Sequence, residues 1–587
     1  MKKAQRSLRE FEKLKSQLRQ IENSVNHCKD SNLWNHEASV RKKIKELKGL
    51  NDKQQFKEYN ALIDGYLKLL DNISMRLLNF YNKKNATDYK FEDVVSKDKK
   101  GYISSGIISV LITSHIPKLI ADEFTKHFPA NPKDEYEKAR NIRRKVTLHL
   151  GETNTGKTYQ AVERLKQSKK GVYLAPLRIL ALENFEKLNK EGVPCNLITG
   201  EEEILVEKAN HVCSTIEKLD VNTTYDVAVI DEIQMIADSQ RGQAWTRALL
   251  GLQCEEIHIC GAINAKELIV KILEDCGDYF DIIEYKRQTP LEVYSEPFTV
   301  KDAMKGDALV AFSKKRVLEI SKYFSDIGIK NSVIYGDLPP EVRKMQYQAF
   351  ISGTNTILVT TDAIGMGVNL PIRRIIFMNL KKFDGEELRY LTSQEVKQIG
   401  GRAGRKGIYD VGYVGVNSYD QLFLKEYLET KDEQLNQAVI GPSEAIIQIV
   451  GLPLKEKLAL WSTQNEKLQY YRKMDVRDYL LILENIKYYK LPEATEYKLM
   501  KLPFDVNDTE LLQCFINFVE EYFKKDTGNI SKPELSGEML SDLERYYQKI
   551  NLYYSFSKNF NIDFDPNWVY KEREIVSEKI NKLLLEL

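Results

Sequence analysis

The sequence lacks three features that would place it in a specialised class of protein. Its seven cysteines form no CxxC pair and are odd in number, so they predict neither a zinc ribbon nor a disulfide framework. No stretch reaches the ~20 consecutive apolar residues of a membrane span, and the best candidate, residues 101–121, is interrupted by serines, a histidine and a lysine. The net charge is only +2, from 87 Lys and Arg against 85 Asp and Glu, which excludes a histone-like polycation.

A chain of 587 residues is long enough for about four compact domains. Charged residues make up 29% and aromatic residues 10% of the chain, as is typical of a folded globular protein rather than a disordered one. The N-terminal segment is basic, but it contains Glu10, Glu12 and Glu22 and has no apolar stretch like that of a secretory signal. We therefore expect a cytoplasmic location with reduced thiols.

Helical patterns occupy both ends of the chain, over residues 1–134 and 436–587. In the N-terminal region apolar residues recur every three or four positions, which predicts amphipathic helices. The first examples are Leu8, Phe11, Leu14, Leu18 and Ile21. Residues 1–50 contain thirteen Lys and Arg against six Asp and Glu, an excess that indicates either a solvated helix face or a contact with RNA or a protein partner.

Short β-branched runs alternate with helical patterns in the middle of the chain. The runs lie at residues 145–150, 171–175, 226–231, 256–261, 307–312, 331–336, 356–361 and 373–378. This alternation is typical of buried parallel strands connected by helices. We expect two doubly wound α/β units in tandem, over residues 135–288 and 289–435, which join near Arg287.

A complete GxxxxGK[ST] motif follows the first predicted strand and opens a helix. Its residues are Gly151, Glu152, Thr153, Asn154, Thr155, Gly156, Lys157 and Thr158. Glycines allow the backbone to wrap closely around phosphate oxygens, and the helix N-terminus supplies positive potential. We expect Lys157 to reach the β- and γ-phosphates of ATP and Thr158 to bind Mg²⁺.

Two further motifs complete a candidate ATPase site. Asp231 and Glu232 end the run at 226–231, where Asp231 is expected to bind Mg²⁺ and Glu232 to orient the attacking water as general base. In the second α/β unit, Arg402 and Arg405 are three residues apart, which predicts that they share one helix face. Such arginines suit the γ-phosphate of ATP held by the first unit, as arginine fingers.

The ordered set of motifs resembles superfamily-two helicases, and specifically the SUV-three-like RNA helicases of the mitochondrial degradosome. The matching segments are RRKVTLHLGETNTGKTYQA, PLRILALE, TGEEE, DEIQMIADSQRGQAWTRALLGL, YGDLPPEVRKMQYQAF, TTDAIGMGVNLP and QIGGRAGR. DEIQ in place of DEAD or DEAH, followed by RGxAWTRALLGL, is diagnostic of that family. The resemblance covers residues 135–435 and implies two tandem RecA-like parallel-sheet domains between the helical ends.

The resemblance also assigns roles to single residues. It implies that Gln398 senses the nucleotide, that Asp362 and Gly367 lie near ATP, and that residues 260–262 couple hydrolysis to domain closure. It further implies a nucleic-acid-binding face that holds phosphates and riboses with little sequence specificity. The residues of this face are Pro176, Arg178, Thr199, Gly200 and Thr215 in the first unit and Ser313, Gly336 and Thr360 in the second.

The activity that the resemblance implies is that of an ATP-dependent RNA helicase with ATP and Mg²⁺ as cofactors, moving 3′ to 5′ on single strands in RNA turnover. Three alternatives stay open: a DNA or RNA/DNA-hybrid helicase, because backbone contacts discriminate sugars poorly, an ATP-gated RNA clamp that recruits a nuclease, and a packaging motor. RNA is the expected partner, with DNA and an exoribonuclease as further candidates, and no membrane partner is expected. The segment at the start of the sequence does not resemble a transit peptide, so we expect a bacterial-type homologue in the cytoplasm. If the chain is an organellar homologue, the mitochondrial matrix replaces the cytoplasm.

Overall fold

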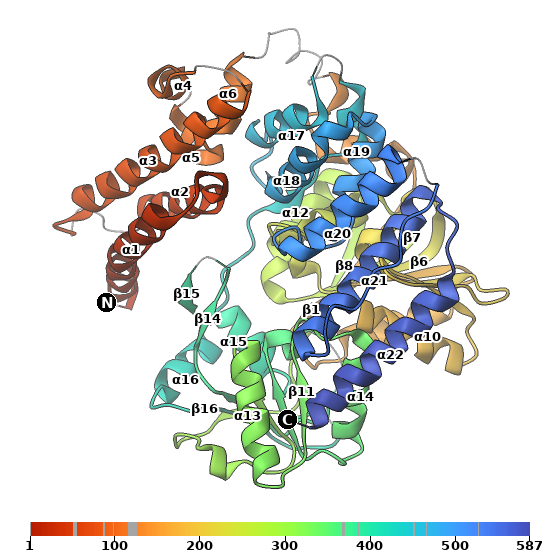
Figure 1. Ribbon diagram of the computed structural model, residues 1–587. Helices are drawn as coiled ribbons and strands as arrows, with labels where there is room; N and C mark the ends of the chain where they lie inside the picture. Colours follow the sequence, from red (N-terminus) through yellow and green to blue (C-terminus); the bar gives the residue numbers. More distant parts are fainter. Residues whose placement is uncertain are drawn as a thin grey trace. The chain divides into compact units, whose positions relative to one another are not determined.

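The computed structural model describes residues 2–50, 56–85, 89–97, 99–115, 126–366, 370–385, 387–405, 407–449, 452–464, 466–525 and 528–586. The chain divides into two compact units, Met1–Phe128 with Pro442–Asn465 and Pro129–Gly441 with Glu466–Leu587 (Figure 1). Over the described ranges, no helix is both long and apolar enough to cross a bilayer.

The smaller unit is helical, as predicted for its N-terminal residues, and it also includes residues 442–465, which were expected in the C-terminal region. Its helices are α1 (Lys2–His27), α2 (Trp34–Gly49), α3 (Tyr59–Asn85), α4 (Phe91–Lys97), α5 (Lys99–Ser105), α6 (Ile107–His115) and α17 (Leu454–Thr463). The hydroxyl of Tyr66 on α3 donates to the carbonyl of Leu14 on α1 at 2.7 Å. The buried carboxylate of Glu37 on α2 accepts the N–H of Ile107, the first residue of α6, at 2.9 Å. These contacts tie four helices around one apolar core.

The first sheet of the larger unit has eight strands in the order β4-β3-β5-β2-β6-β7-β1-β8. All neighbouring pairs are parallel except β3–β4. Its elements are α8 (Glu137–Arg140), β1 (Lys145–Gly151), α9 (Lys157–Lys166), β2 (Gly171–Ala175), α10 (Arg178–Lys190), β3 (Cys195–Ile198), β4 (Glu203–Ile204), β5 (His211–Thr215), β6 (Thr224–Ile230), α11 (Gly242–Gly251), β7 (Gln253–Gly261), α12 (Lys266–Cys276) and β8 (Tyr279–Tyr285).

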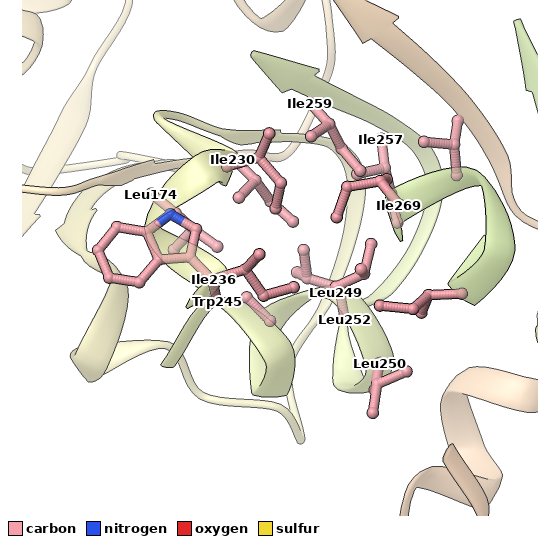
Figure 2. Close-up of a cluster of buried hydrophobic side chains, with 14 of the residues drawn as sticks. Leu174, Ile230, Ile236, Trp245, Leu249, Leu250, Leu252, Ile257, Ile259 and Ile269 are labelled. Carbon is pink, nitrogen blue, oxygen red and sulfur yellow. The ribbon is translucent and has the colours of Figure 1, made fainter. Parts of the chain in front are cut away.

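The core on one side of this sheet is built around Trp245 on α11, which is completely buried (Figure 2). Strand residues such as Ile230 and Ile257 pack in the same cluster. Residues from beyond the second sheet also complete this core, because Ala438 and Tyr471 belong to the cluster. The hydroxyl of buried Thr246 on α11 donates to the carbonyl of Val439 at 2.6 Å, which fixes the returning segment on the first sheet.

The second sheet has six parallel strands in the order β11-β12-β10-β13-β16-β9. A separate two-stranded antiparallel hairpin, β14–β15, lies between β13 and α15 in the sequence. The elements are β9 (Leu291–Val293), β10 (Asp307–Val310), α13 (Lys314–Asp326), β11 (Asn331–Ile334), α14 (Pro340–Ile351), β12 (Ile357–Thr360), β13 (Arg374–Phe377), β14 (Lys381–Phe383), β15 (Leu388–Tyr390), α15 (Ser393–Gly400), β16 (Gly412–Val416) and α16 (Gln421–Glu429).

The remaining residues of the larger unit form a short parallel pair and five helices. These are β17 (Ala438–Ile440), β18 (Tyr471–Lys473), α18 (Arg477–Ile486), α19 (Glu493–Met500), α20 (Thr509–Val519), α21 (Leu540–Phe560) and α22 (Pro566–Leu585). The predicted fold class, two parallel-sheet units flanked by helical ends, is therefore confirmed.

Candidate active site

The carboxyl ends of β1, β6 and β7 meet at one edge of the first sheet, because Leu150 lies opposite Gly261 and Ile230 opposite Ile259 in the parallel register. The P-loop runs from the end of β1 to the start of α9. Asn154 and Gly156 adopt left-handed conformations, with φ of 65° and 85°, and no side chain caps the N-terminus of α9. The open amides of this turn fit the phosphate chain of a nucleotide.

The side chain of Lys157 folds back onto the P-loop. Its Nζ donates to the carbonyl of Gly151 at 2.8 Å and to that of Glu152. Burial lowers the pKa of Lys157, and the nearby carboxylates Glu232 and Asp231 oppose that shift. The ammonium group is thus placed so that phosphate oxygens of a bound nucleotide can replace these carbonyls as its hydrogen-bond acceptors.

The two residues predicted to bind Mg²⁺ contact each other directly. Thr158 Oγ1 donates to Asp231 Oδ1 at 3.0 Å, and the hydroxyl of Tyr173 holds Asp231 Oδ2 at 2.8 Å. Burial, together with repulsion from Glu232, raises the pKa of Asp231 to about 6. A cation would stabilise the charged form of this buried carboxylate, and the neighbouring hydroxyl offers a second oxygen ligand. The pair therefore fits Mg²⁺, which takes few protein ligands and completes its coordination shell with phosphate and water.

Glu232 is held in position by the last residue of the DEIQ motif. It adopts a left-handed conformation with φ of 50°, an uncommon one for a residue other than glycine. The amide of Gln234 donates to Glu232 Oε2, and Gln234 Oε1 accepts the N–H of Ala262 at 3.0 Å. Gln234 thus joins the predicted general base to residues 260–262. Sequence reasoning read Gln234 only as a family signature, although its place in DEIQ was the available signal.

The turn that carries Arg402 contacts the P-loop. Asn154 Nδ2 donates to the carbonyl of Gly404 at 3.3 Å, and a Cβ added at Gly401 would lie 2.9 Å from Thr153 Cβ. Arg402 donates to the carbonyl of Gly365 through Nε at 3.1 Å and Nη2 at 2.6 Å. The structure thus brings the P-loop and the turn of Arg402 together, and the prediction of an arginine finger requires that proximity.

The prediction that Arg402 and Arg405 share a helix face is wrong. Helix α15 ends at Gly400, so both arginines lie in the turns beyond it. Gly404, which lies between the two arginines, takes a left-handed φ of 72°, in which a helix does not continue, so no helix face includes both. Arg405 is half-buried.

Of the other nucleotide-site predictions, Gln398 is half-buried on α15. Its Cγ lies 3.5 Å from where a Cβ on Gly365 would be, so it faces the segment that Arg402 also contacts. Asp362 is exposed and pairs with Lys382 at 3.1 Å. Gly367 lies outside the described residues. All of these roles stay predictions.

Arg178, expected on the nucleic-acid face, lies in a cluster of carboxylates. Its guanidinium contacts Glu201 at 2.8 Å, Glu202 at 3.1 Å and Glu341 of the second sheet unit at 2.9 Å. The hydroxyl of Tyr547 on α21 accepts from Arg178 at 3.0 Å and donates to Glu341 at 2.7 Å. A strand phosphate would have to compete with these partners. No signal in the sequence indicated Glu341, and Tyr547 is buried.

The other residues of the first unit that were predicted to bind nucleic acid make hydrogen bonds within the protein. The carbonyl of Pro176 accepts from Arg241 at 2.6 Å, and that of Gly200 accepts from Ser555 on α21 at 2.9 Å. The hydroxyl of Thr199 accepts the N–H of Glu202 at 2.9 Å. Thr215 is half-buried at the end of β5.

In the second unit, three predicted nucleic-acid residues lie at or just beyond the carboxyl ends of parallel strands. The hydroxyl of Ser313 caps α13 by accepting the N–H of Arg316 at 3.2 Å. Gly336 borders open space, since a Cβ there would meet no atom within 4 Å. Thr360 is completely buried, and its hydroxyl donates to the carbonyl of Thr361 at 3.0 Å. A role for these residues in binding a strand stays a prediction.

The fold and the site together define a superfamily-two helicase, with a P-loop and an acidic pair in one parallel-sheet unit and an arginine-bearing turn in the next. Three known domains match the chain. Residues 132–285 match the DEXQ-box helicase domain of Suv3, residues 291–407 the helicase conserved C-terminal domain, and residues 540–586 the ATP-dependent RNA helicase SUV3 C-terminal domain.

Curated relatives agree with these matches. The chain is 36% identical to the mitochondrial ATP-dependent RNA helicase SUV3 of Saccharomyces cerevisiae, over 77% of this chain and 67% of that protein. It is 37% identical to the mitochondrial DExH-box ATP-dependent RNA helicase DExH16 of Arabidopsis thaliana, over 78% and 83%. It is 36% identical to human mitochondrial SUPV3L1, also named an ATP-dependent RNA helicase, over 74% and 59%. The chain belongs to the SUV3 family of DEXQ-box helicases.

Proposed function

We propose that this chain is an ATP-dependent RNA helicase, which uses the hydrolysis of ATP to move along a single strand and separate RNA duplexes. The observation that carries the proposal is the contact between the P-loop and the turn of Arg402. A nucleotide at this junction is contacted by both sheet units, so its hydrolysis changes how the two units hold each other. The names of the relatives as RNA helicases support RNA as the substrate.

The residues of the first sheet would bind the nucleotide and activate water. Thr158 and Asp231 would hold Mg²⁺, and Lys157 with the loop amides would hold the phosphates. When bound, Mg²⁺ supplies Lewis-acid polarisation of the phosphoryl oxygens. Glu232 would accept the proton of the attacking water, in the position that Gln234 gives it.

The residues of the second sheet would complete the site. Arg402 and Arg405 would neutralise the charge that develops on the transferred phosphoryl group, and Gln398 would sense the nucleotide. Because Arg402 is already bound to the carbonyl of Gly365, it would reorient only when the two units close on ATP. Hydrolysis would then reverse that closure and shift the grip on the strand.

Substrate polarity, partners and location are further parts of the proposal. We expect 3′-to-5′ movement and unwinding of 3′-tailed duplexes, with an exoribonuclease as the partner that consumes the released strand. The names of the relatives support the mitochondrial alternative over the cytoplasmic expectation, and fractionation of the source cells decides between them.

The first test is steady-state ATPase activity of the full chain with and without single-stranded RNA or DNA, at one fixed salt concentration. Lys157→Ala and Glu232→Gln should abolish RNA-stimulated turnover while the circular dichroism spectrum stays unchanged. Stimulation by RNA over DNA, followed by unwinding of 3′-tailed but not 5′-tailed duplexes, is the expected result. Equal stimulation by both nucleic acids would favour a mixed helicase. Tight ATP-dependent RNA binding without stimulation would favour the clamp.

A further inference from the structure

The segment that joins the two sheet units contacts both the P-loop and the turn of Arg402. At its start, β8 lies beside β1, and a Cβ added at Gly151 would lie 2.2 Å from the carbonyl oxygen of Tyr285. At its end, Thr289 packs against Gly404, where an added Cβ would lie 2.9 Å from Thr289 Cγ2. Arg287 lies between these two contacts.

The guanidinium of Arg287 donates to three backbone carbonyls. Nε donates to Thr289 at 2.6 Å, Nη1 to Gly401 at 2.5 Å, and Nη2 to Ala403. Two of these carbonyls, those of Gly401 and Ala403, lie just beyond the end of α15 at Gly400. A planar guanidinium reaches three diverging acceptors in a way that a lysine ammonium does not.

The carbonyls of Gly401 and Ala403 belong to the residues on either side of Arg402. Arg287 therefore fixes the backbone before and after the predicted arginine finger. The backbone N–H of Arg287 also donates to Glu152 Oε2 of the P-loop at 3.1 Å. One residue of the connecting segment thus contacts both walls of the ATP site.

We propose that Arg287 is a positioning residue, which holds the turn of Arg402 against the P-loop so that the finger reaches the transition state. This inference rests on the proposed function, because it assigns Arg287 to the same ATPase site. It acts through Arg402 and needs no contact with the nucleotide. Its loss should therefore lower kcat and leave the KM for ATP almost unchanged.

The test compares Arg287→Ala, Arg287→Lys, Arg402→Ala and the double variant Arg287→Ala/Arg402→Ala. Lys286→Ala is the matched control, since it removes a positive charge from the exposed neighbouring position of the same segment. A displacement of about 1 Å at a catalytic group costs up to about 10²-fold, so we expect Arg287→Ala to lower kcat by about 10- to 100-fold. Arg287→Lys should be intermediate, and the control should match wild type.

The double variant separates positioning from general structural damage. If Arg287 works through Arg402, the double variant is no slower than Arg402→Ala alone. The inference would be overturned if the fold-losses in kcat of the two single variants multiplied in the double variant. A wild-type kcat in Arg287→Ala, or an effect on KM alone, would overturn it as well. If Arg287→Ala has a lowered melting temperature, Arg287→Lys replaces it in the comparison of single and double variants. A wild-type kcat in Arg287→Lys would then overturn the inference. If wild type shows no stimulation by RNA, the proposed function fails, and the basal ATPase rates of the same variants still test Arg287.

Discussion

Replacing Gln234 by alanine should slow ATP hydrolysis without weakening ATP binding. The side chain makes one bond to the carboxylate of Glu232 and one to the N–H of Ala262. A hydrogen bond to a charged group contributes about 1.5–3 kcal/mol, and each 1.36 kcal/mol of barrier is about tenfold in rate. If the bond to Glu232 is needed fully in the transition state, kcat falls by about 10- to 150-fold. The bond to Ala262 contributes to coupling rather than to the chemical step.

The assay is steady-state ATPase at saturating RNA, followed by the number of base pairs opened per ATP in an unwinding assay. Gln240→Ala is the matched control, because Gln240 is an exposed glutamine nearby. Gln234→Glu should be slower than Gln234→Ala, since it places a second carboxylate beside Glu232. A normal kcat in Gln234→Ala, alongside an inactive Glu232→Gln, would refute the assignment of Gln234 as support for the base.

Two further predictions follow from buried polar contacts. Because the pKa of Asp231 is raised to about 6, ATPase activity at limiting Mg²⁺ should fall as the pH drops through about 6, where a proton takes the place of the cation. Excess Mg²⁺ should move this midpoint to lower pH, and a midpoint independent of Mg²⁺ would contradict the role of Asp231. Thr246→Val leaves the carbonyl of Val439 without its donor and should lower the free energy of unfolding by about 1–3 kcal/mol, measured by urea denaturation. An unchanged midpoint would show that the contact contributes nothing.

Eight strands, β1, β2, β6, β7, β10, β11, β12 and β13, were predictable from sequence because they are apolar, β-branched runs. Two strands that also lie inside their sheets, β5 and β16, were not predicted. The prediction of β1 at 145–150, for example, differs from the structure by one residue. Strands such as β8, with alternating exposure, and β4, with two residues, were missed. Their residues carry no uniform apolar signal, so only pairing with a neighbouring strand defines them.

The ATP motifs were predictable because each is a local pattern whose chemistry depends on adjacent residues. The contacts that position them are not local. Gln234 reaches a residue 28 positions away and Arg287 residues 114 and 116 positions away, and no spacing rule reports such partners. The prediction that Arg402 and Arg405 share a helix face was wrong because i, i+3 spacing places two residues on one face only within a helix, and α15 ends before both of them.

The packing of Ala438 and Tyr471 against the core of the first sheet has a consequence for how the protein is made. The ribosome completes all eight strands of that sheet long before it reaches Ala438 and Tyr471, which close part of its core. Until then the face of α11 around Thr246 lacks its cover, and the hydroxyl of Thr246 lacks its contact with the carbonyl of Val439. During synthesis, the core of the first sheet therefore stays incomplete until Ala438 and Tyr471 have been translated, which comes after the last strand of the second sheet.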